Sequence, residues 1–288
     1  MRFTKDWKDY EILDAGDGMK LERWKNVILS RPDPQAIWKP VRPDLWKQAN
    51  AKYNRSKTGG GSWSFYKNLP PKWTIEYGSL KFYIEPTGFK HTGLFPEQAA
   101  NWDFIREKVV AASARRPVRV LNLFAYSGGA TLAAAAGGAE VYHVDASKGM
   151  VAWAKENAVA SGLADRPIHW IVDDCGKFIQ REIRRGRRYD GIIMDPPSYG
   201  RGPSGEIWKM ETSFYPFLQE TVKLLSDDPL FVIINSYTTG LAPSAVAYAS
   251  DVVFGAAHGG KTVAGELGLP VKQSGLVLPC GATGRWTP

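Results

Sequence analysis

The sequence predicts an α/β fold in which a Rossmann-like sheet of mainly parallel strands follows a small β-rich N-terminal domain. Three observations support this prediction. Residues 119–145 read as an apolar strand, a glycine turn, a helix of small residues and a second strand. Two later apolar strands end, as the second strand does, on aspartates. Before residue 92, short strand-like runs alternate with turn residues, and helical periodicity is poor.

The N-terminal domain is expected to cover residues 1–92 and to contain two hairpins. Its strand-like runs are residues 10–13, 20–24, 27–29, 73–77 and 80–85. Asp17-Gly18 lies between the first two runs and is a strong signal for a tight hairpin turn. Gly78-Ser79 separates the last two runs in the same way. Residues 54–64 are rich in Gly and Ser, which predicts a flexible loop.

Positive charge and aromatic side chains gather in residues 39–72. This stretch carries eight Lys or Arg and one acidic residue, Asp44. The interleaved aromatic residues are Trp38, Trp46, Tyr53, Trp63, Phe65, Tyr66 and Trp73. Because cations neutralise phosphates and aromatic rings stack on bases, the stretch suits single-stranded RNA. The alternative is a solvated basic surface with its tryptophans in a small core. The net charge of +8 favours a polyanionic partner.

The second domain, residues 93–288, should open with a helix and then form the first strand–turn–helix–strand unit. The expected elements are a helix beginning at Pro96, a strand at 118–124, a helix at 130–136 and a strand at 141–144. Gly128 and Gly129 allow a sharp turn close to a ligand. Asp145 ends the second strand, where an acidic residue usually binds ribose hydroxyls. An ordinary unit without a ligand is the alternative.

Later elements continue the same pattern. They are a helix within 147–163, strands at 168–172, 192–194 and 230–234, a helix at 243–253, and a final strand pair at 261–265 and 274–279. Three strands of one unit thus end in carboxylates, at Asp145, Asp173-Asp174 and Asp195. Their position at one sheet edge indicates a polar ligand. The sequence has no G-x-G-x-x-G and no P-loop motif, which disfavours a dinucleotide or a P-loop nucleotide.

Four segments resemble one known family. VLNLFAYSGGAT, VDASKGMVAWAKENA, IIMDPPSYG and TGLFPEQ are similar to motifs of the class I S-adenosylmethionine-dependent methyltransferases. More narrowly, they resemble the group that includes the 23S ribosomal RNA 5-methylcytosine methyltransferases. The resemblance covers roughly residues 75–240. It implies a seven-stranded sheet whose last strand is inserted antiparallel, S-adenosyl-L-methionine as cofactor, and ribosomal RNA as partner.

The resemblance also implies site residues. Phe124, Ala125, Tyr126 and Gly128 would line the methionine end of the cofactor. Asp145 would bind the ribose hydroxyls, and Asp174 with Asp173 would meet the adenine. Gln98 would help to close the pocket. The other candidate cofactor-binding residues are Ser127, Ala146, Ser147, Cys175 and Asp195. The candidate catalytic residues are Asp195, Pro196, Pro197 and Tyr199, beside the transferred methyl group.

The chain departs from this group in its cysteines. A Cys nucleophile follows the fifth strand in relatives that methylate carbon 5 of a pyrimidine, but here Asn235-Ser236-Tyr237-Thr238 follows it. This departure argues against the covalent route and leaves methyl transfer itself as the expected activity. Cys175 and Cys280 are interpreted as small, partly buried residues, with Cys280 as the alternative nucleophile. The segment resembles the D-P-P-Y loop of amino-directed methyltransferases, but Tyr199 lies one place later. Methylation of an exocyclic amine therefore stays an alternative.

An RNA methyltransferase is therefore the leading hypothesis. The alternatives are a methyltransferase acting on a protein or small molecule, and a non-catalytic RNA-binding module. The two cysteines suggest a reducing compartment, and no segment looks like a membrane span or a signal peptide, so we expect a cytoplasmic protein without a membrane partner. The four scattered histidines carry no metal-binding motif, and no metal is expected.

Overall fold

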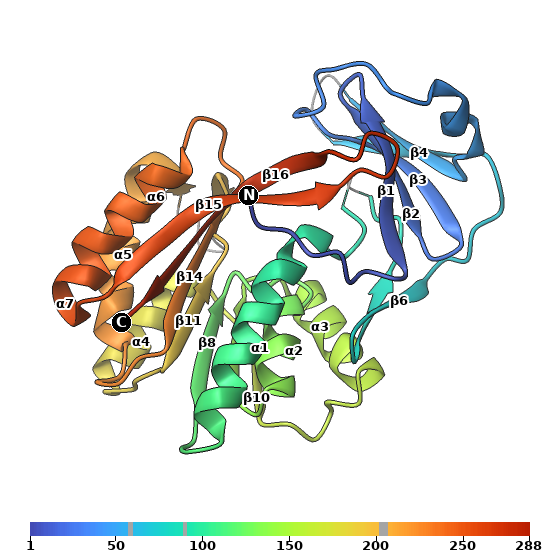
Figure 1. Ribbon diagram of the computed structural model, residues 1–288. Coiled ribbons are helices and arrows are strands. Elements are labelled where there is room, and N and C mark those ends of the chain that lie inside the picture. The colour runs from blue at the N-terminus through green and yellow to red at the C-terminus, as the bar shows by residue number, and fades with distance from the viewer. Residues whose placement is uncertain (57–59, 89–90, 202–206) are drawn as a thin grey trace. The chain divides into compact units, whose positions relative to one another are not determined.

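The structure is a computed structural model that describes residues 1–56, 60–88, 91–201 and 207–288. The chain forms two compact units, whose elements are labelled in Figure 1. The first unit comprises Met1–Ala100 and Gly268–Cys280, and the second comprises Asn101–Leu267 and Gly281–Pro288. The domain boundary between residues 92 and 93 stays a prediction. Lys57 of the basic stretch lies outside the described residues.

A five-stranded sheet, ordered β1-β2-β3-β4-β5, is the main element of the first unit. Its strands are β1 (Tyr10–Gly16), β2 (Met19–Trp24), β3 (Val27–Pro32), β4 (Ala51–Arg55) and β5 (Gly61–Phe65), with the 3₁₀-helix η1 (Pro43–Gln48) before β4. Between β1 and β2, Asp17 and Gly18 have left-handed φ angles of 51° and 72°. A type I′ turn requires two such residues, so the predicted Asp-Gly hairpin is confirmed.

The second predicted hairpin is also present. β6 (Trp73–Tyr77) and β7 (Leu80–Ile84) pair antiparallel as a separate two-stranded sheet. The 3₁₀-helix η2 (Pro96–Gln98) then leads into α1 (Ala99–Ser113), so the expected helix at Pro96 begins with a 3₁₀ turn.

The flexible loop expected at residues 54–64 is wrong at both of its ends, while residues 57–59 lie outside the described ranges. β4 and β5 pair antiparallel out to Arg55 and Gly61, and both strands reach into the expected loop. A Cβ at position 61 would overlap the backbone carbonyl of Asn54. Glycine is therefore needed at position 61 because the two strands approach closely. The high glycine content of the segment had suggested flexibility instead.

Trp63 on β5 takes part in the packing of the first unit. Its ring meets that of Tyr53 edge-on, with centroids 5.4 Å apart, and its Nε1 donates to Thr87 O at 2.8 Å. The ring of Trp63 is half-buried, and its part in RNA binding stays a prediction.

A buried ionic network links neighbouring strands of the first unit. Glu22 is fully buried, and its Oε2 accepts from Arg31 Nε at 2.6 Å. Tyr10 Oη donates to Glu22 Oε1 at 2.7 Å, and Lys20 Nζ lies 3.3 Å from Asp33 Oδ2. Burial alone would raise the pKa of Glu22, but Arg31 and Lys20 lower it to about 2. The ionised carboxylate therefore stabilises the folded state at pH values above the usual pKa of a glutamate.

We expect Glu22→Gln to destabilise the protein at neutral pH and to lose this effect in acid. The substitution leaves Arg31 buried without its counter-charge, which costs roughly 3–5 kcal/mol of unfolding free energy. Because the folded pKa lies below the unfolded one, the wild-type advantage is complete above pH 4.5 and fades as the pH falls toward 2. Urea unfolding of both proteins over this range measures the difference. Glu76→Gln, at an exposed pair, is the control, and a pH-independent difference would contradict the argument.

The second unit is built on the seven-stranded sheet that the sequence predicted. Its order is β10-β9-β8-β11-β14-β16-β15. The strands are β8 (Arg119–Leu123), β9 (Glu140–Asp145), β10 (Ile168–Val172), β11 (Gly191–Met194), β14 (Phe231–Ser236), β15 (Lys261–Pro270) and β16 (Val277–Thr287). The first five are parallel, and β16 is antiparallel to β14. This arrangement confirms the α/β class and the antiparallel last strand.

The final two strands extend beyond the expected segments 261–265 and 274–279, although β16 begins only at Val277, and residues 268–270 and 277–280 of these strands belong to the first unit. β15 contains Gly265 and Gly268 and ends at Pro270, residues that normally weaken a strand. β15 is at the edge of the sheet, where one side of the strand needs no partner, so these residues are tolerated.

Helices cover both faces of the large sheet (Figure 1). They are α1, α2 (Gly129–Ala136), α3 (Lys148–Ala160), α4 (Cys175–Arg184), α5 (Met210–Thr221), η3 (Val222–Leu224), α6 (Pro243–Ser250), the π-helical turn η4 (Asp251–Gly255) and α7 (Ala256–His258). Gly128 and Gly129 allow α2 to approach Ala154 of α3 and Trp102 of α1. No helix within the described ranges is long and apolar enough to cross a membrane.

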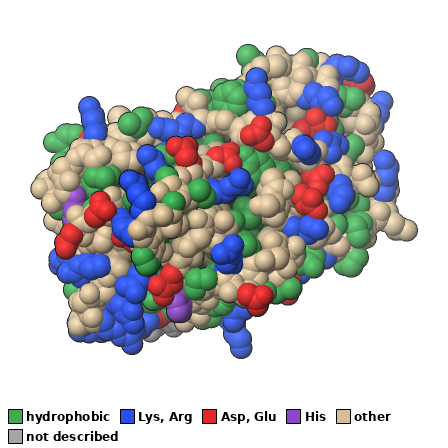
Figure 2. All heavy atoms as spheres, turned by 60° about the horizontal axis from the view of Figure 1, so that its bottom comes forward, with side chains coloured by type: hydrophobic (Ala, Val, Ile, Leu, Met, Phe, Trp, Pro, Cys, Tyr) green, Lys and Arg blue, Asp and Glu red, His purple; other side chains and the backbone are tan. Residues whose placement is uncertain are grey.

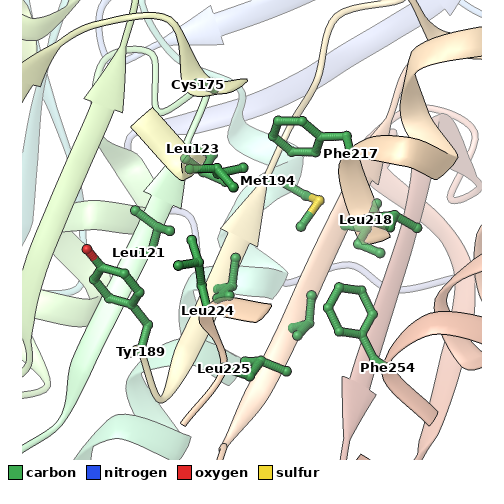
Figure 3. Packing of buried hydrophobic residues seen from close by; sticks show 14 of the residues in the cluster. Leu121, Leu123, Cys175, Tyr189, Met194, Phe217, Leu218, Leu224, Leu225 and Phe254 are labelled. Carbon is green, nitrogen blue, oxygen red and sulfur yellow. The ribbon is translucent and has the colours of Figure 1, made fainter. Parts of the chain in front are cut away.

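The face of the sheet that α4 and α5 cover carries the main hydrophobic core (Figure 3). Leu121 and Leu123 of β8 point into it, together with Met194 of β11 and Phe217 of α5. Alternate residues of these strands point to the α1–α3 face, as the pleat of a strand requires. Packing in this core therefore fixes where β8 and β11 end, and with it the position of the residues that follow these strands.

Candidate active site

The loop between β8 and α2 adopts an unusual backbone conformation. Phe124 and Tyr126 have left-handed φ angles of 54° and 49°, and Gly128 has a φ of 89°. Bulky residues rarely adopt such angles, and they persist only where the surrounding structure holds them. Conformations of this kind are concentrated at ligand sites, so this loop is the first candidate.

Two hydrogen bonds from neighbouring elements hold the loop. Ala125 N donates to Val144 O of β9 at 3.1 Å. On the other side, the side-chain amide of Asn157 on α3 donates to Ser127 O at 2.9 Å. Asn157 is fully buried, so this bond is sheltered from water. The backbone of the loop is therefore held in place by the fold itself.

Asp145 at the end of β9 is a third anchor. Its Oδ2 accepts from Tyr126 N and its Oδ1 accepts from Ser147 N, each at 2.8 Å. Burial raises the pKa of Asp145, while these two donors oppose the rise. Each carboxylate oxygen keeps a second lone-pair direction for a further donor. Ala146 and Ser147 beside it are exposed, and Ser147 caps α3 by accepting from Met150 N at 3.3 Å.

The two aspartates after β10 have partners within the fold. Asp173 Oδ2 lies 2.6 Å from a guanidinium nitrogen of Arg181. Asp174 Oδ1 accepts from Lys177 N at 2.9 Å, which caps the N-terminus of α4. These contacts fix the orientation of both carboxylates at the same sheet edge as Asp145.

The register of the sheet sets the order in which the strand ends meet. Paired neighbours near this edge are Val172 with Asp145, Val144 with Leu123, and Leu123 with Met194. Along the edge, the residues therefore follow the order Asp173, Asp145, Phe124, Asp195. Adjacent strands are about 4.8 Å apart, so the backbones of Asp145 and Asp195 are about 10 Å apart, with Phe124 between them. The chain order reverses between β8 and β11, which is where ligands bind in such sheets.

The segment after β11 is held by two contacts from elsewhere in the second unit. Pro196 and Pro197 have no N–H to donate. The carbonyl of Pro197 accepts from Trp208 Nε1 at 2.6 Å. Ser198 Oγ lies 2.8 Å from Thr238 Oγ1, just beyond β14. These contacts restrain the Asp-Pro-Pro segment next to the switch point.

Tyr199 begins a short hairpin that the sequence did not predict. β12 (Tyr199–Arg201) pairs with β13 (Ile207–Lys209), and residues 202–206 between them lie outside the described ranges. The side chain of Tyr199 is 52% exposed. An exposed ring after an Asp-Pro-Pro segment can contact a planar substrate.

An aromatic cluster joins the two loops of the site. The ring of Phe124 lies 5.5 Å from that of Trp208 and 5.6 Å from that of Phe217. Trp208 and Phe217 meet edge-on at 5.3 Å. The sequence gave no signal for the contacts of Phe217 or for the Ser198–Thr238 contact. Residues far apart in the sequence meet here only through the fold.

The remaining candidates are placed as follows. Cys175 is buried at the start of α4, and its Sγ accepts from Phe124 N at 3.3 Å. Gln98 is buried and belongs to the first unit, as does the partly buried Cys280. Burial raises the pKa of both thiols.

Comparison with known proteins agrees with this geometry. Residues 56–227 match the family model described as S-adenosylmethionine-dependent methyltransferase. The crystal structure of a SAM-dependent methyltransferase from Agrobacterium tumefaciens is 38% identical, with a TM-score of 0.93, and the match covers 100% of this chain and 93% of that one. SMU.776, a methyltransferase solved in complex with SAH, shares the fold at 18% identity, with a TM-score of 0.73 over 97% of this chain and 76% of that one.

Among curated proteins, the ribosomal RNA large subunit methyltransferase K/L of Shewanella baltica is 35% identical over 165 residues. The match covers 57% of this chain but only 22% of that protein, so the chain spans about a fifth of its length. The family match over more than half of the chain and the full-length likeness to the Agrobacterium enzyme lead to one conclusion. This chain belongs to the S-adenosylmethionine-dependent methyltransferase family.

Proposed function

We propose that this S-adenosylmethionine-dependent methyltransferase modifies a base of ribosomal RNA. The observation that carries the proposal is the carboxyl edge of the sheet, where the strained loop and the Asp-Pro-Pro segment meet through one aromatic cluster. The names of the curated relatives and the net charge of +8 support RNA as the substrate. The proposed location is the cytoplasm, because two cysteines in 288 residues suit a reducing compartment.

The residues of this edge fit the cofactor by their chemistry. Asp145 has accepting capacity for ribose hydroxyls, and Asp174 with Asp173 offers carboxylates toward the adenine. The loop of residues 124–128 would line the methionine end with backbone groups. Further members of the proposed set are Ser127, Ala146, Ser147, Cys175 and Asp195. The bound cofactor supplies an electrophilic methyl group.

The acceptor would lie beside Asp195. Because Pro196 and Pro197 have no N–H, this segment offers mainly acceptors to the substrate. Acceptors orient an N–H-bearing group, so an amine or ring nitrogen of a base fits better than carbon 5 of a pyrimidine. Tyr199 would stack on the same base.

Neither cysteine is expected to act as a nucleophile. We expect the double variant Cys175→Ser, Cys280→Ser to retain methyl transfer, because burial raises the pKa of both thiols and suppresses the reactive thiolate that a covalent route would need. Initial rates with a radiolabelled methyl donor measure this. Loss of turnover with intact cofactor binding would restore covalent catalysis.

The proposed function is tested by following the methyl group. Ribosomal RNA from cells lacking the protein is incubated with the enzyme and with S-adenosylmethionine labelled in its methyl group, and mass mapping then locates the label. We expect one modified base that is absent from the untreated RNA. Label found only in protein or in small molecules would support the alternative substrate classes. Cofactor binding without any transfer would point to a non-catalytic module.

A further inference from the structure

The first unit contains a half-open pocket of about 680 Å³, within the size range of small-ligand sites. It lies inside the basic and aromatic stretch of residues 39–72 and beside the β1–β2 turn. The lining residues that matter for its chemistry are Trp46, Lys47, Lys52 and Tyr66. All of its walls come from the first unit, so its shape depends on this unit alone.

One wall of the pocket is preorganised by Asp14. This aspartate is fully buried, and its Oδ2 accepts from Arg42 N at 2.9 Å and from Trp46 Nε1 at 3.0 Å. Its Oδ1 also accepts from Val41 N at 3.2 Å. A Cβ on Gly16 would overlap the backbone of Pro40, so the segment closes on β1 only because residue 16 is glycine. The indole of Trp46 is therefore held in one orientation.

The pocket presents two cations. Within the described residues neither Lys47 nor Lys52 forms an ion pair within 4 Å, although the charge of Lys47 acts on the nearby carboxylate of Asp44. The carboxylate of Asp17, which also lines the pocket, is already paired with Lys39 Nζ at 2.8 Å. Two ammonium groups in one concave site favour an anionic ligand. Figure 2 shows one face of the molecule, on which Lys and Arg side chains lie among Asp and Glu, with a denser group of Lys and Arg at its lower left.

The pocket also presents aromatic surface. Tyr66 is 60% exposed, although its backbone N–H is anchored to Asn50 O at 2.8 Å. Within the described part of the chain no other aromatic ring stacks on Tyr66 or Trp46. Open aromatic faces next to free ammonium groups combine the two features that hold single-stranded RNA, base stacking and phosphate neutralisation.

We propose that this pocket binds one unpaired nucleotide of the RNA substrate. The base lies against Tyr66 and Trp46, and the adjoining phosphates contact Lys47 and Lys52. The proposal rests on the proposed function, because it takes RNA as the substrate. An acidic peptide would satisfy the lysines but would leave the aromatic faces without a partner, so the nucleotide accounts for more of the site.

The test measures binding of a short fluorescent single-stranded oligoribonucleotide by anisotropy over a range of salt concentrations. Tyr66→Ala should weaken binding roughly 5- to 150-fold, the loss expected when one base loses its stacking partner. Tyr66→Phe keeps the ring and should bind as the wild type does. Lys47→Ala and Lys52→Ala should each reduce the slope of log affinity against log salt by about 0.7.

Two matched controls separate the pocket from general effects. Tyr248→Ala removes a 76% exposed ring from the second unit, and Lys5→Ala removes an exposed charge outside the pocket. Neither control variant should change the affinity for RNA, apart from the small effect of one lost positive charge in Lys5→Ala. Affinity for S-adenosylmethionine, measured by calorimetry, should be the same in all variants and reports correct folding.

The outcomes distinguish the inference from the proposed function. Unchanged RNA affinity in Tyr66→Ala would overturn the pocket, while continued methylation of ribosomal RNA would leave the proposed function standing. Equal competition by polyglutamate or by an RNA duplex would also overturn it, because neither offers an unpaired base. Wild-type protein that neither binds nor methylates RNA would instead remove the proposed function on which the inference rests.

Discussion

Replacing Asp145 by alanine is expected to weaken S-adenosylmethionine binding by roughly 150- to 25,000-fold. The estimate takes two charge-assisted hydrogen bonds to the ribose hydroxyls at about 1.5–3 kcal/mol each. The structure adds a second reason. Asp145 also accepts from Tyr126 N, and Tyr126 belongs to the strained loop that would line the methionine end of the cofactor. The same substitution therefore removes a side chain that binds the cofactor and also frees the loop from its anchor.

Calorimetric titration with the cofactor measures this effect, and thermal unfolding shows whether the variant folds. Glu140→Ala is the matched control, because Glu140 begins the strand that Asp145 ends. Its partners, Arg119 and His169, lie near the amino ends of β8 and β10, at the edge of the sheet opposite to Asp145. Unchanged affinity in a folded Asp145→Ala protein would show that Asp145 does not bind the cofactor.

The sequence could predict the strand ends because the signal there is local. An apolar run followed by an acidic residue shows both where a strand ends and what it presents, and this located Asp145, Asp173 and Asp195. The parallel order of strands then brought these residues to one edge. No side-chain contact had to be known for this step.

Contacts between distant segments could not be predicted in this way. Ser198 and Thr238 are 40 residues apart in the sequence, and nothing in either neighbourhood indicates that their hydroxyl groups meet. The same holds for Phe124 and Phe217, and for the Asp14 contacts that shape the pocket of the first unit. Such pairs arise from packing, which periodicity and composition do not report.

Glycine was the main source of error. In the segment 54–64 it suggested a flexible loop, yet Gly61 is a strand residue at a close approach of two backbones. At Asp17-Gly18 the same residue type correctly predicted a turn, because the flanking runs alternate. Glycine permits both outcomes, and only the pairing of its neighbours decides between them.

Replacing Asp195 by alanine is expected to lower the rate of methyl transfer roughly 100- to 10,000-fold while cofactor affinity changes less. Asp195 follows β11, next to the switch point, and the two prolines after it donate no hydrogen bonds. The carbonyl of Pro197 is already used by Trp208. The carboxylate is therefore the acceptor in this segment best suited to orient a substrate amine or to take up its proton, a role with this range of effect.

Single-turnover rates on RNA, with saturating cofactor, measure the chemical step without product release. Asp195→Asn distinguishes the two possible roles of the carboxylate. An amide still accepts a hydrogen bond through its oxygen, so a positioning role predicts partial activity for this variant. A proton-accepting role predicts that Asn and Ala are equally slow, because an amide cannot take up the proton. Asp228→Ala, at an 83% exposed carboxylate, is the control. A wild-type rate in Asp195→Ala would place the acceptor group elsewhere along the edge, with Tyr199 as the next residue to replace.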